Sequence, residues 1–130
     1  MEKKFTYGKN QKLKSRKLID ALFIKKQAVN AYPVRVFFAF VDESDFALKA
    51  AVSVSSRNFK KAVHRNRIKR LLRESYRLNK NNLLHLILQK NKKMVLFFLF
   101  VDKQMPDFET INIAVTTALQ KLIKQVENAE

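Results

Sequence analysis

The residues best suited to chemistry are the cations between Arg57 and Arg77, a stretch of 21 residues that holds nine Lys or Arg side chains and one acid, Glu74. Arginine presents a planar fork of N–H donors that matches phosphate oxygens two at a time and that stacks on bases, while lysine carries a compact point charge. A third of the chain's 27 basic residues lie here. This composition favours contact with a polyanion.

The spacing of these cations is that of a helix. At about 100° per residue, one i, i+4 row contains Arg65, Lys69, Arg73 and Arg77, flanked by Asn66 and Arg70. The opposite face carries the side chains that we expect to be buried: His64, Ile68, Leu71, Leu72, Ser75 and Leu78. The pattern predicts a helix with one buried side and one side that faces negative charge.

Glu74 lies one turn after Arg70, so we expect an i, i+4 ion pair between them that leaves the basic row available. For Lys60 and Lys61 a solvated face is an equally good interpretation. The predicted nucleic-acid contacts are Arg57, Lys60, Lys61, Arg65, Asn66, Arg67, Lys69, Arg70, Arg73 and Arg77.

Length and composition indicate a single domain, 1–130, with a real core, because 47% of the residues are hydrophobic. The formal net charge of +16 exceeds what solubility requires, and a nucleic acid is the commonest partner that explains it. Cysteine is absent, which excludes disulfides and thiolate metal sites. With no signal peptide in the basic N-terminus and no apolar run long enough to span a bilayer, we expect a cytoplasmic protein without a membrane partner.

Catalysis by side chains has little support. Both histidines, His64 and His85, fall on apolar helix faces, where we expect them to be packed. A single glycine argues against phosphate-cradling loops. The acids of the 42–45 segment could hold a divalent cation, although a solvated turn is the favoured interpretation. The sequence therefore predicts no catalytic residue, and it leaves metal positions undetermined.

The remaining elements are expected to position the basic helix. Residues 1–12 predict a mobile basic arm, and a short helix follows from Ser15 to about Lys26. The runs Val34–Val41 and Phe46–Ser55 are expected to pair as an antiparallel hairpin, with Arg35 and Phe37 together on the less buried face.

The second half of the chain predicts two more helices and one strand. Residues 83–89 predict a short apolar helix, and Met94–Val101 predicts a central strand buried on both faces. Pro106 and Asp107 open a last helix, whose buried face we expect to comprise Ile111, Val115, Ala118, Leu119, Leu122 and Val126. The order α-β-β-α-β-α indicates an α+β fold with helices packed on a small, mostly antiparallel sheet.

The order of residues within the basic helix carries more information than its charge. Residues 62–74, AVHRNRIKRLLRE, closely resemble the signature A-x-x-R-N-R-x-K-R-x-x-R-E of the bacterial ribonuclease P protein subunit. The resemblance covers about residues 12 to 126, including the preceding strand and the order of elements. It implies a fold related to one in ribosomal proteins, with a left-handed β-α-β crossover that departs from the right-handed rule.

The resemblance also implies a function. Members of this family join a catalytic RNA to form an endoribonuclease that hydrolyses precursor tRNA and generates the mature 5′ end. The chemistry is carried by the RNA and by Mg²⁺ bound mainly to it. The implied partners are the catalytic RNA and precursor tRNA, not DNA. A structural or ribosome-associated RNA-binding protein that shares the fold is the alternative.

Two sites follow from the resemblance. The signature residues would lie near the core of the catalytic RNA, and a cleft between the first helix and the sheet would receive the single-stranded 5′ leader. The implied cleft residues are Ile19, Phe23, Arg35 and Phe37. This chain departs from the family pattern at Ile19, where an aromatic is frequent, at Ala51, where glycine is common, and at Ser56-Arg57, where two lysines are common.

Overall fold

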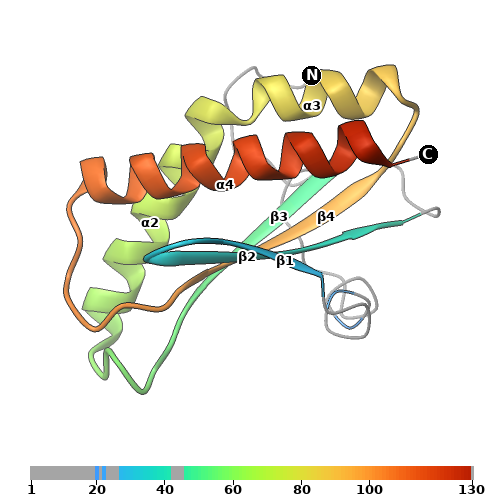
Figure 1. Ribbon diagram of the computed structural model, residues 1–130. Helices are drawn as coiled ribbons and strands as arrows, with labels where there is room; N and C mark the ends of the chain where they lie inside the picture. Colours follow the sequence, from blue (N-terminus) through green and yellow to red (C-terminus); the bar gives the residue numbers. More distant parts are fainter. Residues whose placement is uncertain (1–19, 21, 23–26, 42–45, 130) are drawn as a thin grey trace.

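The computed structural model describes residues 20, 22, 27–41 and 46–129. The predicted mobile arm, 1–12, lies outside these residues, as does most of the predicted first helix. Within them the chain forms four strands and three helices. The helices and the sheet make two layers, with the helical layer above the sheet in Figure 1.

The four strands form one mixed sheet in the order β1-β2-β4-β3. The first two, β1 (Ala28–Ala31) and β2 (Val34–Phe40), are antiparallel neighbours joined by a tight turn at Tyr32 and Pro33. Strand β4 (Met94–Phe100) pairs antiparallel with β2 and parallel with β3 (Leu48–Val54). The short strand β1 was not predicted.

The predicted hairpin between the second and third runs is wrong, because β4 lies between β2 and β3. The physical reason is burial. Strand β4 is apolar at every position, and its residues Met94, Val95 and Leu96 are fully buried although they point to alternate faces. The predicted central position of β4 is confirmed, whereas burial on both faces holds only near its start, because Phe97 and Leu99 on the second face are half-buried.

The parallel pairing of β3 with β4 requires a long connection over one face of the sheet. That connection contains α2 (Ala62–Asn79) and α3 (Asn81–Gln89). The resulting β-α-β crossover is left-handed, as the resemblance implies (Figure 1). None of the helices in the described ranges is long and apolar enough to cross a membrane.

The last helix, α4 (Phe108–Asn128), lies beside α2 and α3 and covers β1 and β2. The Asp107 side chain caps its first turn by accepting a hydrogen bond of 2.8 Å from the backbone N–H of Thr110. All the positions predicted to be buried are buried: Ile111, Val115, Ala118, Leu119, Leu122 and Val126. The predicted start and inner face of this helix are therefore confirmed.

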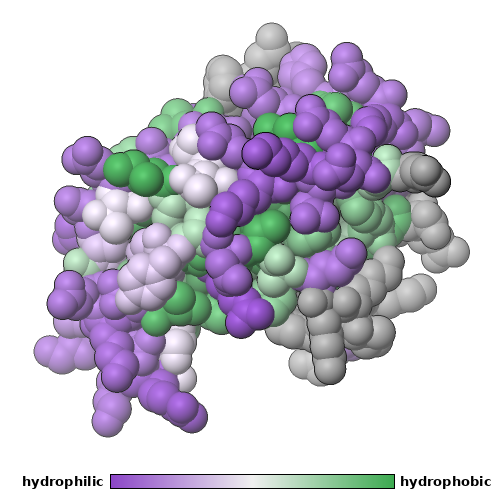
Figure 2. Space-filling view, viewed as in Figure 1, coloured by the Kyte–Doolittle hydropathy of each residue, from purple (hydrophilic) through white to green (hydrophobic). Residues whose placement is uncertain are grey.

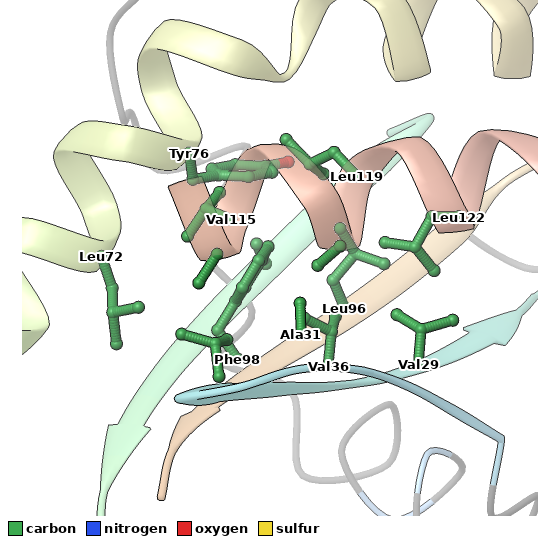
Figure 3. Packing of buried hydrophobic residues seen from close by; sticks show 14 of the residues in the cluster. Val29, Ala31, Val36, Leu72, Tyr76, Leu96, Phe98, Val115, Leu119 and Leu122 are labelled. Atoms are coloured by element: carbon green, nitrogen blue, oxygen red, sulfur yellow. The ribbon is translucent and has the colours of Figure 1, made fainter. Parts of the chain in front are cut away.

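The core fills the space between the helices and one face of the sheet. Figure 3 shows Tyr76 of α2 close to Phe98 of β4, with ring centroids 5.4 Å apart, Leu119 of α4 beside Tyr76, and Leu122 of α4 on the side of the helix that faces the strands. Along the strands, buried residues recur at every second position. These residues form the inner face of the sheet, and the residues between them form the opposite, open face.

The inner face of α2 is narrower than predicted. Ile68, Leu72 and Ser75 are buried, but Leu71 is half-buried and Leu78 is 46% exposed. His64 and His85 are both exposed, so their predicted packing is wrong. Each histidine lies next to the face of its helix that packs on the rest of the molecule, but not on that face. Apolar neighbours in the sequence do not by themselves determine which side of a helix is buried.

Candidate nucleic-acid interface

The start of α2 differs from the prediction and changes where its cations lie. The helix begins at Ala62, and residues 55–61 form a loop instead of its first turns. Phe59 holds this loop because its side chain is buried, with its ring centroid 6.0 Å from that of Phe100. The N-cap residue of α2 is Lys61, and its side chain makes no capping hydrogen bond.

Asn58 anchors the loop instead of capping the helix. Its amide nitrogen donates to the backbone carbonyls of Val101 and Asp102, at 3.4 and 3.3 Å. The loop thereby lies against the segment that follows β4. The basic side chains of the loop, Arg57, Lys60 and Lys61, are all exposed. Figure 2 shows hydrophilic side chains gathered at the lower left, where Figure 1 places this loop and the start of α2.

The cations of α2 fall into two groups by exposure. The predicted row of Arg65, Lys69, Arg73 and Arg77 is half-buried along its whole length. Arg67 and Arg70 are exposed, as is Asn66 between the row and Arg67. The row therefore lies along the margin of the buried strip, and Arg67 and Arg70 face outward.

Arg65 is engaged by the protein's own backbone. Its Nη1 donates to the carbonyl oxygens of Phe59 at 2.7 Å and Lys60 at 2.8 Å. The guanidinium thus joins the first turn of α2 to the loop before it. Sequence periodicity placed Arg65 among the phosphate contacts and gave no signal of these two acceptors.

Glu74 pairs with Arg77 and not with Arg70, so the predicted ion pair is wrong. The two N–H groups of Arg77, on Nε and Nη2, donate to the two carboxylate oxygens at 3.0 and 2.6 Å. Hydrogen bonding from Arg77 lowers the pKa of Glu74, and the same bond raises the pKa of Arg77. The pair offsets one cation at the C-terminal end of the basic surface.

Two of the four residues that the resemblance implies for the leader cleft, Arg35 and Phe37, lie within the described ranges, on the open face of the sheet. Arg35 and Phe37 share this face of β2, as predicted, with the Arg35 guanidinium carbon 5.0 Å from the ring centroid of Phe37. Phe97 of β4 is the partner of Phe37 across the strands, with ring centroids 6.3 Å apart. Phe97 was not among the residues predicted for this site. It lies beside Phe37 only because β4 pairs with β2, and this pairing was not predicted.

Leu22 covers one end of this face. Leu22 is fully buried against Ala39 and Val95, on the face that carries Arg35 and Phe37. Ile19 and Phe23, the other two implied cleft residues, lie outside the described residues. Ala51, a departure from the family pattern, lies on the same face, beside Phe97.

A divalent cation finds no ligand set on the basic surface. Guanidinium and ammonium groups have no acceptor atoms, whereas Mg²⁺ takes oxygen ligands. In the part of the chain that the structure describes, no three His, Asp or Glu side chains are grouped in a way that could hold a metal ion.

Comparisons with known proteins agree with one another. A model of the Ribonuclease P family matches residues 7–125. The ribonuclease P protein component of Porphyromonas gingivalis strain W83 is 33% identical over 126 residues, which cover 96% of this chain and 92% of that protein. The protein component of Chlorobium phaeobacteroides is 26% identical over 125 residues, 88% of this chain and 86% of that protein.

The fold has a solved counterpart. The structure of the Staphylococcus aureus RNase P protein is similar with a TM-score of 0.64 and 18% sequence identity. The similarity covers 85% of this chain and 94% of that one.

Proposed function

The chain belongs to the ribonuclease P protein family, and on that premise we propose that α2 and the loop before it bind the catalytic RNA, while the open face of the sheet binds the 5′ leader of precursor tRNA. As the protein component, it works with the RNA subunit of an endoribonuclease in tRNA 5′ processing. The proposal concerns which residues make the RNA contacts.

The proposal that α2 and its preceding loop bind the catalytic RNA rests on one observation: their exposed cations face outward on one surface. Arg57, Lys60 and Lys61 of the loop and Arg67 and Arg70 of α2 are all exposed. Apart from Glu74, which pairs with Arg77, residues 57–77 contain no acid. Such a surface gains affinity from phosphates chiefly by releasing the counterions that surround RNA.

The charge of the surface is also useful at low Mg²⁺. Two RNAs that approach each other repel through their phosphates, and divalent cations screen this repulsion. Fixed protein cations at the junction take over part of that screening. We propose that Mg²⁺ is held by the RNA, because the exposed side chains of the surface are cationic and offer it no ligands.

The second part of the proposal rests on Arg35 and Phe37. An unpaired nucleotide offers a flat base and a charged phosphate, and a half-buried aromatic ring beside an exposed guanidinium suits both. Phe97 extends the aromatic surface across to β4. We also propose that the protein works in the cytoplasm, because that is where its substrate, precursor tRNA, is processed.

Reconstitution tests the assignment. The full chain is added to its cognate RNA at low Mg²⁺, and cleavage of precursor tRNA at the mature 5′ end is measured. We expect the native protein to stimulate cleavage, and the variant Arg67→Ala/Arg70→Ala to require more protein or more Mg²⁺ for the same rate. Lys124→Ala, which removes an exposed cation of α4, is the matched control.

Two outcomes contradict the proposal. If native protein does not raise cleavage, the chain does not act with that RNA in tRNA processing. If the Arg67→Ala/Arg70→Ala variant binds the catalytic RNA as tightly as Lys124→Ala does, the interface lies elsewhere. Isolation of the tagged protein from cells should recover the catalytic RNA and precursor tRNA, whereas recovery of ribosomal RNA alone would support a ribosome-associated role.

A further inference from the structure

Arg65 differs from the other cations of the signature in what its guanidinium contacts. The Nη1 nitrogen donates to two successive backbone carbonyls, those of Phe59 and Lys60, at 2.7 and 2.8 Å. An N–H group that is directed at a carbonyl is not available to a phosphate. Arg67 is only two residues further along the helix, and it is exposed.

The loop that Arg65 holds carries three exposed cations, Arg57, Lys60 and Lys61. Its own turn is short, with the backbone N–H groups of Asn58 and Phe59 both donating to the carbonyl of Ser55 at 3.2 Å. These cations repel one another, and no acid lies in the first turn of α2 to offset them. The loop therefore depends on contacts from outside itself to keep one conformation.

Those contacts come from three directions. Asn58 is bound to the carbonyls of Val101 and Asp102, Phe59 is buried against Phe100, and Arg65 holds the carbonyls of Phe59 and Lys60. Of these three side chains, Arg65 is the one that contacts the end of the loop next to α2, where the Lys61 carbonyl also accepts from the backbone N–H groups of His64 and Arg65 at 3.1 and 3.2 Å. A surface that is already ordered before binding loses less conformational entropy when it binds.

We propose that Arg65 is a positioning residue: it contributes to RNA affinity mainly by holding loop 55–61 in the conformation that presents Lys60 and Lys61. This inference rests on the proposed function, because it assumes that the loop and α2 contact RNA. It assigns to one signature arginine a role different from that of its neighbours Arg67 and Arg70, which contact phosphate directly.

A double-mutant cycle on RNA affinity separates the two roles. The variants are Arg65→Ala, the pair Lys60→Ala/Lys61→Ala, and all three changes together, each measured at several salt concentrations. Loss of one phosphate contact lowers the log–log salt slope by about 0.7 to 0.9. For a positioning role, Arg65→Ala lowers the slope by about 2, and adding the lysine changes then lowers it little further.

Arg67→Ala is the matched control. It removes a signature arginine that is exposed and for which the described residues offer no hydrogen-bond partner. It should lower the slope by about 0.7 to 0.9, and its effect should add to that of Lys60→Ala/Lys61→Ala. Arg65→Met accompanies Arg65→Ala, because it keeps the aliphatic stem of the side chain and removes only the donors.

Amide hydrogen exchange reports on the loop directly. In Arg65→Met the amides of Asn58 and Phe59 should exchange at least about tenfold faster than in native protein, while the amide of Phe98 in β4 stays protected. Faster exchange throughout the sheet would mean that the variant is unfolded, and the Arg65→Met affinity would then count against a local positioning role.

The results distinguish the failure of this inference from that of the proposed function. The inference is wrong, and Arg65 is a direct phosphate contact, if three results are found together. Arg65→Met lowers the salt slope by the amount expected for one phosphate contact, its effect adds to that of the lysine changes, and the Asn58 and Phe59 amides stay protected. If Arg67→Ala and Lys60→Ala/Lys61→Ala also leave RNA affinity unchanged, the proposed interface itself is wrong.

Discussion

The carboxylate of Glu74 holds Arg77, three residues later, through two hydrogen bonds of 2.6 and 3.0 Å, and it does not pair with Arg70, one turn earlier. Arg77 is therefore paired with an anion of its own chain, whereas Arg70 is exposed. Helix periodicity gives Arg70 and Arg77 the same predicted role, but their different partners lead us to expect different contributions to RNA affinity.

The first prediction compares these arginines. Arg70→Ala should weaken binding to the catalytic RNA and lower the salt slope by about 0.7 to 0.9. Arg77→Ala should lower the salt slope less, because the Arg77 N–H groups on Nε and Nη2 already donate to Glu74 and not to a phosphate. Filter binding or fluorescence titration at several salt concentrations measures both quantities. Equal slopes for the two variants would show that the Glu74 pair does not hold Arg77 away from the RNA.

The second prediction concerns the leader. Phe37→Leu, which keeps an apolar side chain but removes the ring, should weaken binding of precursor tRNA by about 1 kcal/mol, at the low end of the range for base stacking on aromatic side chains. Binding of tRNA without a leader should not change. Affinities of the reconstituted particle for the two substrates test this. An equal loss for both substrates would assign Phe37 to the fold instead.

The third prediction concerns the core beneath the basic surface. Leu72 is fully buried in α2, so Leu72→Ala should lower the free energy of unfolding by about 2 to 4 kcal/mol. Leu78→Ala is the control, because Leu78 lies in the same helix and is 46% exposed. Urea unfolding followed by circular dichroism gives both values. Similar losses for the two variants would contradict the observed orientation of α2.

The fourth prediction concerns the polar contact between α2 and α4. The Asn112 side-chain oxygen accepts hydrogen bonds of 2.8 Å from both the Ser75 hydroxyl and the Asn79 amide. Asn112→Ala leaves these part-buried donors without that acceptor and should cost about 1 to 3 kcal/mol. Adding Ser75→Ala should then cost little more, because the hydroxyl has already lost its acceptor. Full additivity in urea unfolding would mean that the three groups do not act together.

The fifth prediction concerns pH. Hydrogen bonds from the Thr110 side chain and backbone lower the pKa of Asp107, the N-cap of α4. A carboxyl whose pKa is lower in the folded state stabilises the protein above its unfolded pKa of about 3.9, and this stabilisation is lost as the pH falls through the folded pKa. Asp107→Asn keeps a good cap without a titrating group.

Thermal unfolding between neutral pH and about pH 2.5 measures the effect, since this range includes the pKa of an aspartate in the unfolded chain and the interval below it. The midpoint temperature of the native protein should fall more steeply with acid than that of Asp107→Asn, whereas the two should be close at neutral pH. Parallel curves would show that the cap does not depend on ionisation of Asp107.

The sequence by itself determined the features that depend on residues only a few positions apart. The period of the apolar residues in 108–128 predicted the inner face of α4 at every position named, and Asp107 marked its start. Alternation along β2 placed Arg35 and Phe37 on one face. The order of residues in 62–74 identified the family. These features follow from helix and strand periods, which require no knowledge of distant segments.

Tertiary structure decided what depends on which segments meet. The insertion of β4 between β2 and β3 maximises the burial of the most apolar strand, and it also brings Phe97 beside Phe37. Burial of Phe59 against Phe100 turns residues 55–61 into a loop and delays the start of α2 to Ala62. That loop supplies the carbonyls that Arg65 holds, so even a side chain within the signature obtains its partners from long-range packing.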